Sequence, residues 1–265
     1  MSSQPPRPTR SGFTLIEVLV VLSIITLLIS MLLPALGHAR ANARMVWCAS
    51  NQRQIVSALA MYGDESRFFP AGLDAAPNNN DRIWLWPVQM RRFTGREQTI
   101  FSCPQAPGYT KWQFKTAPGE PSFFGYEKDE MRIRGYTQKM SYGYNVWGAF
   151  MMQNPNTGLG VYRDHPFLDA APVTRIIKPS AMVAFADSNP NDYWSGFIGP
   201  YRTGQWPSRI HLGNPNVAYV DTHVEIEQRA KLVDVMIDVE ANKRWNNDHQ
   251  YHTGSIQNDG VPDFP

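Results

Sequence analysis

A long apolar run near the N-terminus constrains this chain more than any other feature. The run extends from Phe13 to Leu36, and Glu17 is the only charged residue in it. About 18 consecutive apolar residues are enough to predict a transmembrane helix. At about 1.5 Å per residue, this run would cross a hydrocarbon core about 30 Å thick. We therefore expect the segment to insert into a membrane.

The single acidic residue in this run predicts a functional site, because a carboxylate at mid-bilayer costs about 3 kcal/mol. Two alternatives stay open. Glu17 can be an interfacial residue that reaches the headgroups. The sequence Ala35-Leu36-Gly37 can be a secretory cleavage site, which would make His38 the mature N-terminus. The run is longer than the roughly 7–15 apolar residues of a secretory signal, which favours a membrane anchor.

The charges are balanced outside the first twelve residues. The chain has 25 Lys and Arg residues against 23 Asp and Glu residues, and Arg7 and Arg10 account for this excess of two. Arg40 and Arg44 follow the apolar run, so positive charge alone does not orient the span. No clustered basic surface stands out, and we expect no nucleic-acid partner.

Helical periodicity continues beyond the apolar run. Apolar and small residues recur at helical spacing from Leu36 to Tyr62, and Gly63 is the expected stop. The rest of the chain is rich in proline, glycine and asparagine, with short strands and a late helix at Arg229–Ala241. The expected strands are Met140–Val146, Ala181–Ala186, Asn216–Val220 and His223–Ile226, the last two joined by a two-residue turn, Asp221-Thr222.

A long helix followed by short strands predicts an α+β fold with a small antiparallel sheet and long loops. We expect four segments. They are a leader (residues 1–12), a transmembrane and assembly helix (13–36), its amphipathic continuation (37–63) and a globular domain (64–265).

The string Gly12-Phe13-Thr14-Leu15-Ile16-Glu17 resembles the prepilin-type signal of type IV pilins and of type II secretion pseudopilins. This resemblance implies that a prepilin peptidase and methyltransferase cuts after Gly12 and methylates Phe13. It implies that Glu17 pairs with the N-terminus of a neighbouring pilin or pseudopilin subunit. It also implies a pilin-like fold with a single-pass anchor in the inner (cytoplasmic) membrane, a cytoplasmic leader, a periplasmic domain and contacts with secretion machinery.

Further segments resemble the large pseudopilin-like proteins of planctomycetes, which end in a histidine, nine residues and Asp-Gly. In this chain nine residues separate His211 from Asp221, but Thr222 replaces the glycine. A β-branched residue is poor where a turn needs positive φ, so either the turn type differs or Thr222 is strained. The other matching segments are Cys48–Gln54, Tyr62 with Asp64, Phe101–Pro104, Ser141–Asn145, and Lys178–Ser180 continuing to Asp187.

The chain has two cysteines, Cys48 and Cys103, both in the predicted exported part. An oxidising compartment favours a disulfide between them, worth about 4 kcal/mol on the chain-entropy model. Two buried free thiols are the alternative. Two cysteines without regular Cys/His spacing do not predict a structural zinc site.

Four polar residues in the C-terminal half suggest chemistry: Asp187, His211, Asp221 and His223. The first interpretation is structural, with hydrogen bonds that fix a hairpin and its loop. The second is a calcium ion held by Asp187, Asp221 and loop carbonyls, because related pseudopilins bind calcium through loop carboxylates. Catalysis by these residues is the third interpretation.

Two functions remain, and neither is enzymatic, because no Gly-x-Ser-x-Gly, His-Glu-x-x-His or phosphate-binding loop occurs. The first is a pseudopilin or minor pilin that assembles into a fibre. The second is a membrane-tethered periplasmic binding module that never polymerises and uses aromatic loops. The tryptophans of those loops would be Trp84, Trp86, Trp112, Trp147, Trp194 and Trp206. Tryptophans usually belong to the core, which favours the first function.

Overall fold

The computed structural model describes residues 14–75, 83–95, 97, 99–106, 140–147, 156–160, 169–188, 196–200, 207–233 and 238–252. The expected leader and the cleavage site at Gly12 and Phe13 lie outside these residues, as do Trp112, Trp194 and Trp206. The chain divides into two compact units, residues 1–42 and residues 43–265. The first unit contributes the start of a long helix, and the second contains the sheet.

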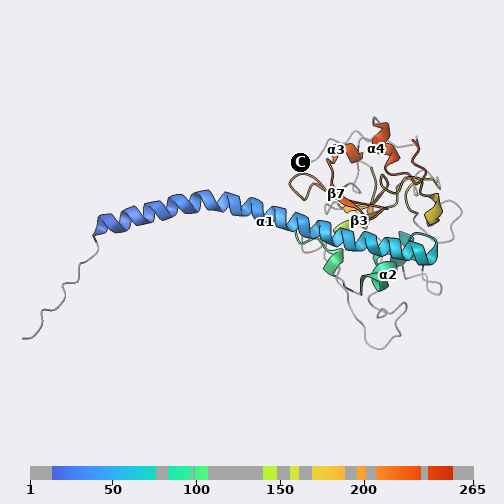
Figure 1. Cartoon of the computed structure of the whole chain (residues 1–265), viewed down its shortest axis with the longest axis horizontal. Helices are drawn as coiled ribbons and strands as arrows, with labels where there is room; N and C mark the ends of the chain where they lie inside the picture. Colours follow the sequence, from blue (N-terminus) through green and yellow to red (C-terminus); the bar gives the residue numbers. More distant parts are fainter. Residues whose placement is uncertain are drawn as a thin grey trace, which may run out of the picture. The chain divides into compact units, whose positions relative to one another are not determined.

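Helix α1 spans Leu15–Ser66 and is the longest described element (Figure 1). It begins with a capping box, in which the Glu17 amide donates to Thr14 Oγ1 (3.3 Å) and the Thr14 amide donates to Glu17 Oε2 (2.8 Å). It is long and apolar enough to cross a membrane, and its most apolar 18-residue window has no buried residue. A core helix of a soluble protein would be buried, whereas a signal sequence could also have this length and composition.

The C-terminal end of α1 differs from the expected stop at Gly63. Gly63 is buried within the helix, and a Cβ there would lie 2.9 Å from Val173 Cγ2. Its role is therefore to allow this close approach. The helix ends three residues later, where Arg67 adopts a left-handed φ of 67° and its amide donates to the Gly63 carbonyl (2.8 Å).

The second unit contains a five-stranded sheet with strand order β5-β3-β4-β6-β7. Strands β3 and β5 pair in parallel and the other pairs are antiparallel, so the sheet is mixed and not purely antiparallel as expected. Its strands are β3 (Tyr142–Asn145), β4 (Val183–Asp187), β5 (Phe197–Ile198), β6 (Asn216–Tyr219) and β7 (Val224–Ile226). A separate antiparallel ribbon pairs β1 (Leu73–Ala75) with β2 (Ile83–Leu85).

Short helices complete the domain. Helix α2 (Trp86–Met90) and the 3₁₀ helices η1 (Arg91–Thr94) and η2 (Thr99–Phe101) follow β2, and η5 (Val173–Arg175) precedes β4. The single late helix expected from the sequence is instead two helices, α3 (Ala230–Val233) and α4 (Val239–Lys243). Asp238 starts the second, because its carboxylate accepts from the amides of Glu240 and Ala241.

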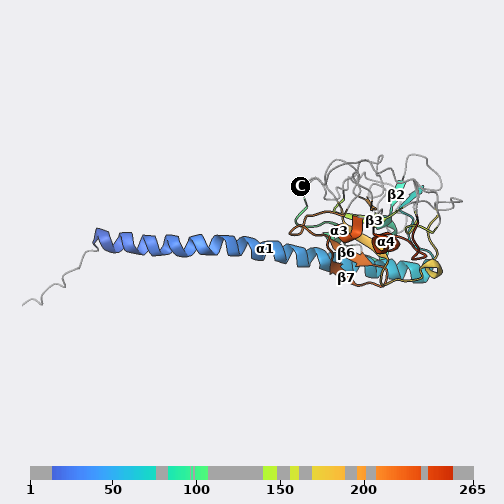
Figure 2. The same cartoon turned by 90° about the horizontal axis from the view of Figure 1, so that it is seen from above.

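Helices lie on both sides of the sheet (Figures 1 and 2). The residues of β3, β4, β5 and β6 are all buried, whereas the edge strand β7 is partly exposed. One face packs on the second half of α1, where Leu59 shares a core cluster with Tyr144 and Phe185. The opposite face packs on α3 and α4, where Val217 meets Leu232. The tryptophans Trp86, Trp147 and Trp245 are fully buried in these two clusters. The domain thus has an α+β layout in which the helix and the sheet share one core.

The packing of α1 on the sheet generates a prediction. Leu59→Ala should lower the free energy of unfolding by about 2–5 kcal/mol, because it leaves a cavity beside Phe185. Met61→Ala, on the exposed side of the same helix, is the matched control and should change it by less than about 0.5 kcal/mol. Denaturant titration of the detergent-solubilised chain, followed by tryptophan fluorescence, measures both. Equal effects would show that α1 does not pack on the sheet through this face.

Candidate functional site

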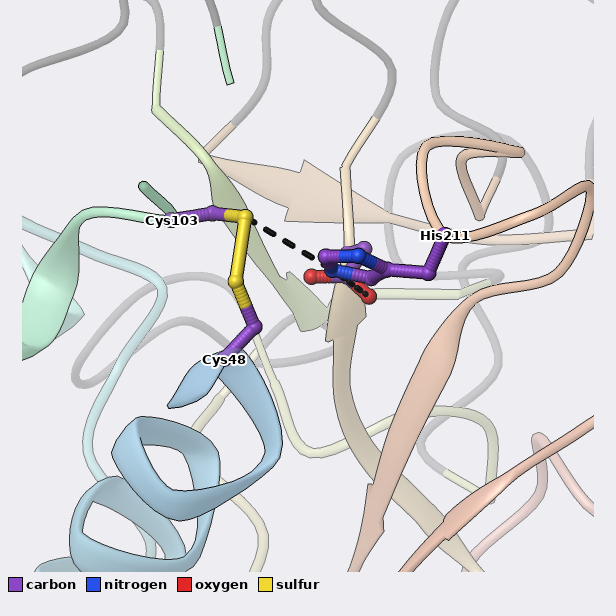
Figure 3. Close-up of side chains that lie close together, drawn as sticks. Cys48, Cys103 and His211 are labelled. Atoms are coloured by element: carbon purple, nitrogen blue, oxygen red, sulfur yellow. Dashed lines mark hydrogen bonds and ion pairs between the residues drawn. A yellow bond between two sulfur atoms is a disulfide. The ribbon is translucent and has the colours of Figure 1, made fainter. Parts of the chain in front are cut away.

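A disulfide joins α1 to the rest of the domain. Cys48 lies in α1, Cys103 follows η2, and their Cα atoms are 5.3 Å apart (Figure 3). Both cysteines are buried, and the bond closes a loop with a sequence separation of 55. The two cysteines are therefore not the free thiols of the alternative interpretation.

The imidazole of His211 lies directly beside this disulfide (Figure 3). Its Nε2 atom is 3.6 Å from Cys103 Sγ and 3.3 Å from Asp187 Oδ2. Its Nδ1 atom is 3.0 Å from Gln105 Oε1, and the amide nitrogen of Gln105 donates to the Ile210 carbonyl. Each ring nitrogen thus faces the side-chain oxygen of a neighbouring residue.

The carboxylate of Asp187 is the centre of the network. It ends β4, and the pairing of Ala186 with Val217 brings it next to the first residue of β6, Asn216. Asp187 Oδ2 accepts from the Asn216 amide (2.7 Å), and Oδ1 accepts from Gln52 Nε2 (3.1 Å). Such bonds are what a buried charge needs, because an unpaired one is costly.

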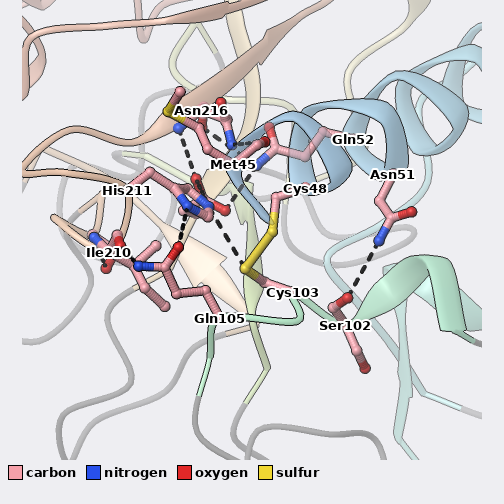
Figure 4. A network of polar contacts seen from close by, with 12 residues as sticks. Met45, Cys48, Asn51, Gln52, Ser102, Cys103, Gln105, Ile210, His211 and Asn216 are labelled. Carbon is pink, nitrogen blue, oxygen red and sulfur yellow. Dashed lines mark hydrogen bonds and ion pairs between the residues drawn. A yellow bond between two sulfur atoms is a disulfide. The ribbon is translucent and has the colours of Figure 1, made fainter. Parts of the chain in front are cut away.

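Helix α1 takes part through two consecutive turns (Figure 4). Gln52 lies one turn after Cys48, so both point from the buried side of the helix. The Met45 carbonyl accepts from Asn216 Nδ2 (3.2 Å), and Asn51 Nδ2 donates to the Ser102 carbonyl (3.3 Å). The network therefore joins α1, the segment after η2, β4 and the start of β6.

Asp221 lies elsewhere, which corrects the expected calcium site. In the antiparallel register Ala186 pairs with Val217 and Val183 pairs with Tyr219. Asp187 is therefore at one end of the β4–β6 pair, whereas Asp221 follows the other end. The structure does not bring these two carboxylates together. For the same reason His211 and Asp221, the two ends of the motif, do not form one site.

The β6–β7 hairpin has a three-residue loop, not the expected two-residue turn. The Tyr219 amide donates to the His223 carbonyl (3.0 Å), and the Thr222 amide donates to the Tyr219 carbonyl (2.9 Å). Thr222 has a φ of 81°, the left-handed position of a type I turn with a G1 bulge. The turn type therefore differs from the expected one, and Thr222 also adopts the positive φ that a β-branched residue disfavours.

Asp221 and His223 form a local pair at this loop. The Asp221 carboxylate accepts from the His223 amide (3.3 Å), and the His223 ring stacks on Tyr219 with centroids 4.3 Å apart. Both side chains are partly exposed. These contacts fix the hairpin, in agreement with the structural interpretation of these two residues.

A second polar cluster holds the same hairpin to α4. Glu227 Oε1 accepts from the Tyr219 hydroxyl (2.8 Å) and pairs with Arg244, which follows α4 (2.6 Å). Burial alone would raise the pKa of Glu227, but the hydrogen bonds from Tyr219 and Arg244 outweigh it and lower the pKa. Burial also raises the pKa of Tyr219, so the hydroxyl stays a donor.

Several of these residues were missed in the sequence. Gln105 and Asn216 belong to no local pattern, since they matter only through partners far along the chain. Gln52 could be noticed from its spacing of one helical turn after Cys48. The capping box was readable, because Thr14 stands three residues before Glu17 at the start of an apolar run.

The buried carboxylate generates a prediction. Asp187→Asn should lower the free energy of unfolding by about 3 kcal/mol, because the new amide turns a donor toward the donors of Gln52 or Asn216 and leaves a buried hydrogen bond unmade. The exposed Asp221→Asn is the control and should cost less than about 1 kcal/mol. Denaturant titration compares the two. Equal losses would contradict a special role for the buried network.

The positive φ of Thr222 generates a further prediction. Thr222→Gly should raise the free energy of unfolding by about 0.5–1 kcal/mol, because glycine removes the Cβ clash at positive φ and loses part of the gain to chain entropy. Thr222→Ala keeps the Cβ and should give no such gain. Thermal or denaturant unfolding distinguishes them, and a destabilised glycine variant would contradict the strain.

Comparison with known proteins identifies one segment. The family model of the prokaryotic N-terminal methylation motif matches residues 7–33. Neither the curated proteins nor the solved structures contain a match to this chain. The matched residues include Gly12, Phe13 and Glu17, and they extend into the exposed half of α1. Residues 7–33 therefore carry a type IV pilin-like signal, which suggests a pilin-type or pseudopilin-type subunit processed by a prepilin peptidase.

Proposed function

We propose that this chain is a pseudopilin or pilin-like structural subunit. Prepilin peptidase cuts it after Gly12, Phe13 is methylated, and residues 13–36 assemble with other subunits into a type II secretion pseudopilus or a related filament. The observation that supports this most is the position of the methylation motif, which runs directly into an exposed apolar helix.

The two halves of α1 have opposite surroundings. Residues 14–40 are all exposed, whereas nine residues from Cys48 to Gly63 are buried in the domain. An exposed apolar helix needs lipid or other apolar helices around it. In our proposal lipid surrounds it before assembly and neighbouring subunits surround it afterwards.

Glu17 can serve both the single chain and the filament. The amide and hydroxyl of Thr14 both donate to Oε2, at 2.8 and 2.9 Å. Oε1 can accept from the α-amino group of a neighbouring subunit. The carboxylate would then cap its own helix and attract the charged N-terminus of the next chain in a medium of low polarity.

The proposal includes a topology and a structural, non-enzymatic role. The leader is cytoplasmic, α1 crosses the inner membrane once, and the domain is extracytoplasmic. The Cys48–Cys103 disulfide supports an oxidising compartment for the domain. Asp187 and His211 are about 1 % exposed or less and are bonded within the domain, which supports a structural role.

The tethered binding module has less support. Two of its six proposed tryptophans, Trp86 and Trp147, are fully buried in the core and cannot contact a ligand. The side chain of Trp84 and the other three lie outside the described part of the chain.

The test separates the charge of Glu17 from its cap. Glu17→Gln keeps a capping side chain but removes the charge, and Thr14→Ala weakens the cap but keeps the charge. We expect Glu17→Gln and Glu17→Ala to reduce incorporation into purified filaments at least ten-fold, and Thr14→Ala to assemble close to the wild-type level. Co-purification with tagged wild-type subunits measures the ratio.

Processing is checked on the same material by the mass of the mature N-terminus. A methylated Phe13 agrees with the proposal, and a start at His38 would indicate an ordinary secretory signal. Glu17→Ala chains that enter filaments at the wild-type ratio would refute the assembly role.

A further inference from the structure

Four side chains, one of them on α1, present a compact set of metal-ligand atoms. One atom from each of Cys48, Cys103, Asp187 and His211 lies within 4.8 Å of the others, and all four residues are buried. Two sulfurs, one imidazole nitrogen and one carboxylate oxygen match the ligands that Zn²⁺ takes in tetrahedral protein sites. No local sequence pattern indicates this set, because its members come from α1, the segment after η2, β4 and the segment before β6.

We propose that the dithiol form of this chain binds one Zn²⁺ through Cys48 Sγ, Cys103 Sγ, His211 Nε2 and the Asp187 carboxylate. The same four side chains would then exist in one of two mutually exclusive states. In one, the sulfurs bond to each other; in the other, both bond to the metal. This site is independent of the proposed filament function.

Two of the distances between ligand atoms already fit a tetrahedral zinc site. A tetrahedral zinc with Zn–N and Zn–O bonds of about 2.0–2.1 Å and Zn–S bonds of about 2.3 Å separates its ligand atoms by about 3.3–3.8 Å. His211 Nε2 lies 3.3 Å from Asp187 Oδ2 and 3.6 Å from Cys103 Sγ. The main change needed is the separation of the two sulfurs from a covalent bond to nonbonded contact.

Gln105 orients His211 as a ligand. Gln105 Oε1 lies 3.0 Å from Nδ1, and the Gln105 amide nitrogen is committed to the Ile210 carbonyl. The oxygen of Gln105 therefore faces the ring and accepts the Nδ1 proton. Nε2, which faces Cys103 Sγ, is then the nitrogen that binds the metal. Zinc-bound histidines usually donate their other ring N–H to an acceptor in the same way.

The carboxylate side is prepared as well. Gln52 Nε2 and the Asn216 amide donate to Asp187 and fix its orientation. The remaining amide oxygens, Gln52 Oε1 and Asn216 Oδ1, are buried without a hydrogen-bond partner. The two donors hold the carboxylate in the position from which it faces His211 Nε2.

A disulfide oxidant, such as a thiol–disulfide exchange protein, converts the zinc state into the disulfide state. Binding of Zn²⁺ to the dithiol form releases both thiol protons, because each sulfur binds as a thiolate. On oxidation the two cysteine sulfurs lose two electrons and form the Cys48–Cys103 bond, and the oxidant gains these electrons and becomes two thiols. Two protons from solvent go to those thiols, and Zn²⁺ is released.

The experiment uses the full-length chain in detergent and Co²⁺ as a spectroscopic probe for zinc. A phosphine reduces the disulfide without adding a thiol ligand. We expect the reduced chain to bind one Co²⁺ per chain with the visible absorption of a tetrahedral thiolate site, and the oxidised chain to show no such absorption. Zn²⁺ should abolish the absorption by displacing Co²⁺.

Variants assign the third and fourth ligands. His211→Gln and Asp187→Asn should each weaken Co²⁺ binding at least ten-fold, and His223→Gln, whose ring lies at the hairpin, should change it less than two-fold. Zinc X-ray absorption of the reduced wild-type chain should show two sulfurs, two lighter ligands and imidazole scattering, which tests His211 even if a variant fails to fold. The proposal is overturned if the reduced chain binds no stoichiometric metal, or if imidazole scattering is absent.

Discussion

The attachment of α1 to the sheet depends on one buried polar junction. Asp187 accepts from Gln52 of α1 and from the first amide of β6, and it faces His211, which lies against the Cys48–Cys103 disulfide. A buried carboxylate is tolerated only when its oxygens accept hydrogen bonds. The positions of α1, β4 and β6 therefore restrict one another. The core cluster that contains Leu59, Tyr144 and Phe185 buries the apolar surface between α1 and the sheet, and the polar junction restricts how the two can pack.

This junction has a consequence for a subunit that is anchored by a helix. The exposed apolar half of α1 and the domain are parts of one chain in which the helix does not end until Ser66. A disulfide and a hydrogen-bonded carboxylate both hold the same segment of α1, which runs from Cys48 to Gln52. A force on this part of the helix would therefore reach the domain through a covalent bond as well as through packing. That property suits the filament role proposed for the chain.

Much of the fold was predictable where it depends on short-range pattern. The helical repeat through Tyr62, the α+β class and the positions of β3, β4, β6 and β7 all follow from residue spacing. The details that differ depend on partners distant in sequence. Gly63 lies inside the helix, where the absence of a Cβ lets Val173 approach closely. The parallel partner of β3 is β5, which has only two residues and therefore leaves no recognisable strand pattern in the sequence. The late helix divides because Asp238 caps a new one.

The sequence by itself determined the N-terminal signal, because the small residue, the aromatic residue, the carboxylate and the apolar run are contiguous and act through local chemistry. It also indicated which polar residues mattered in the C-terminal half, without their grouping. Only the tertiary structure decided that His211 and Asp187 join the two cysteines and that Asp221 belongs to the hairpin. The reason is the antiparallel register of β4 and β6. It puts residues that are 29 positions apart, Asp187 and Asn216, side by side, and it sends Asp221 to the opposite end of the strands.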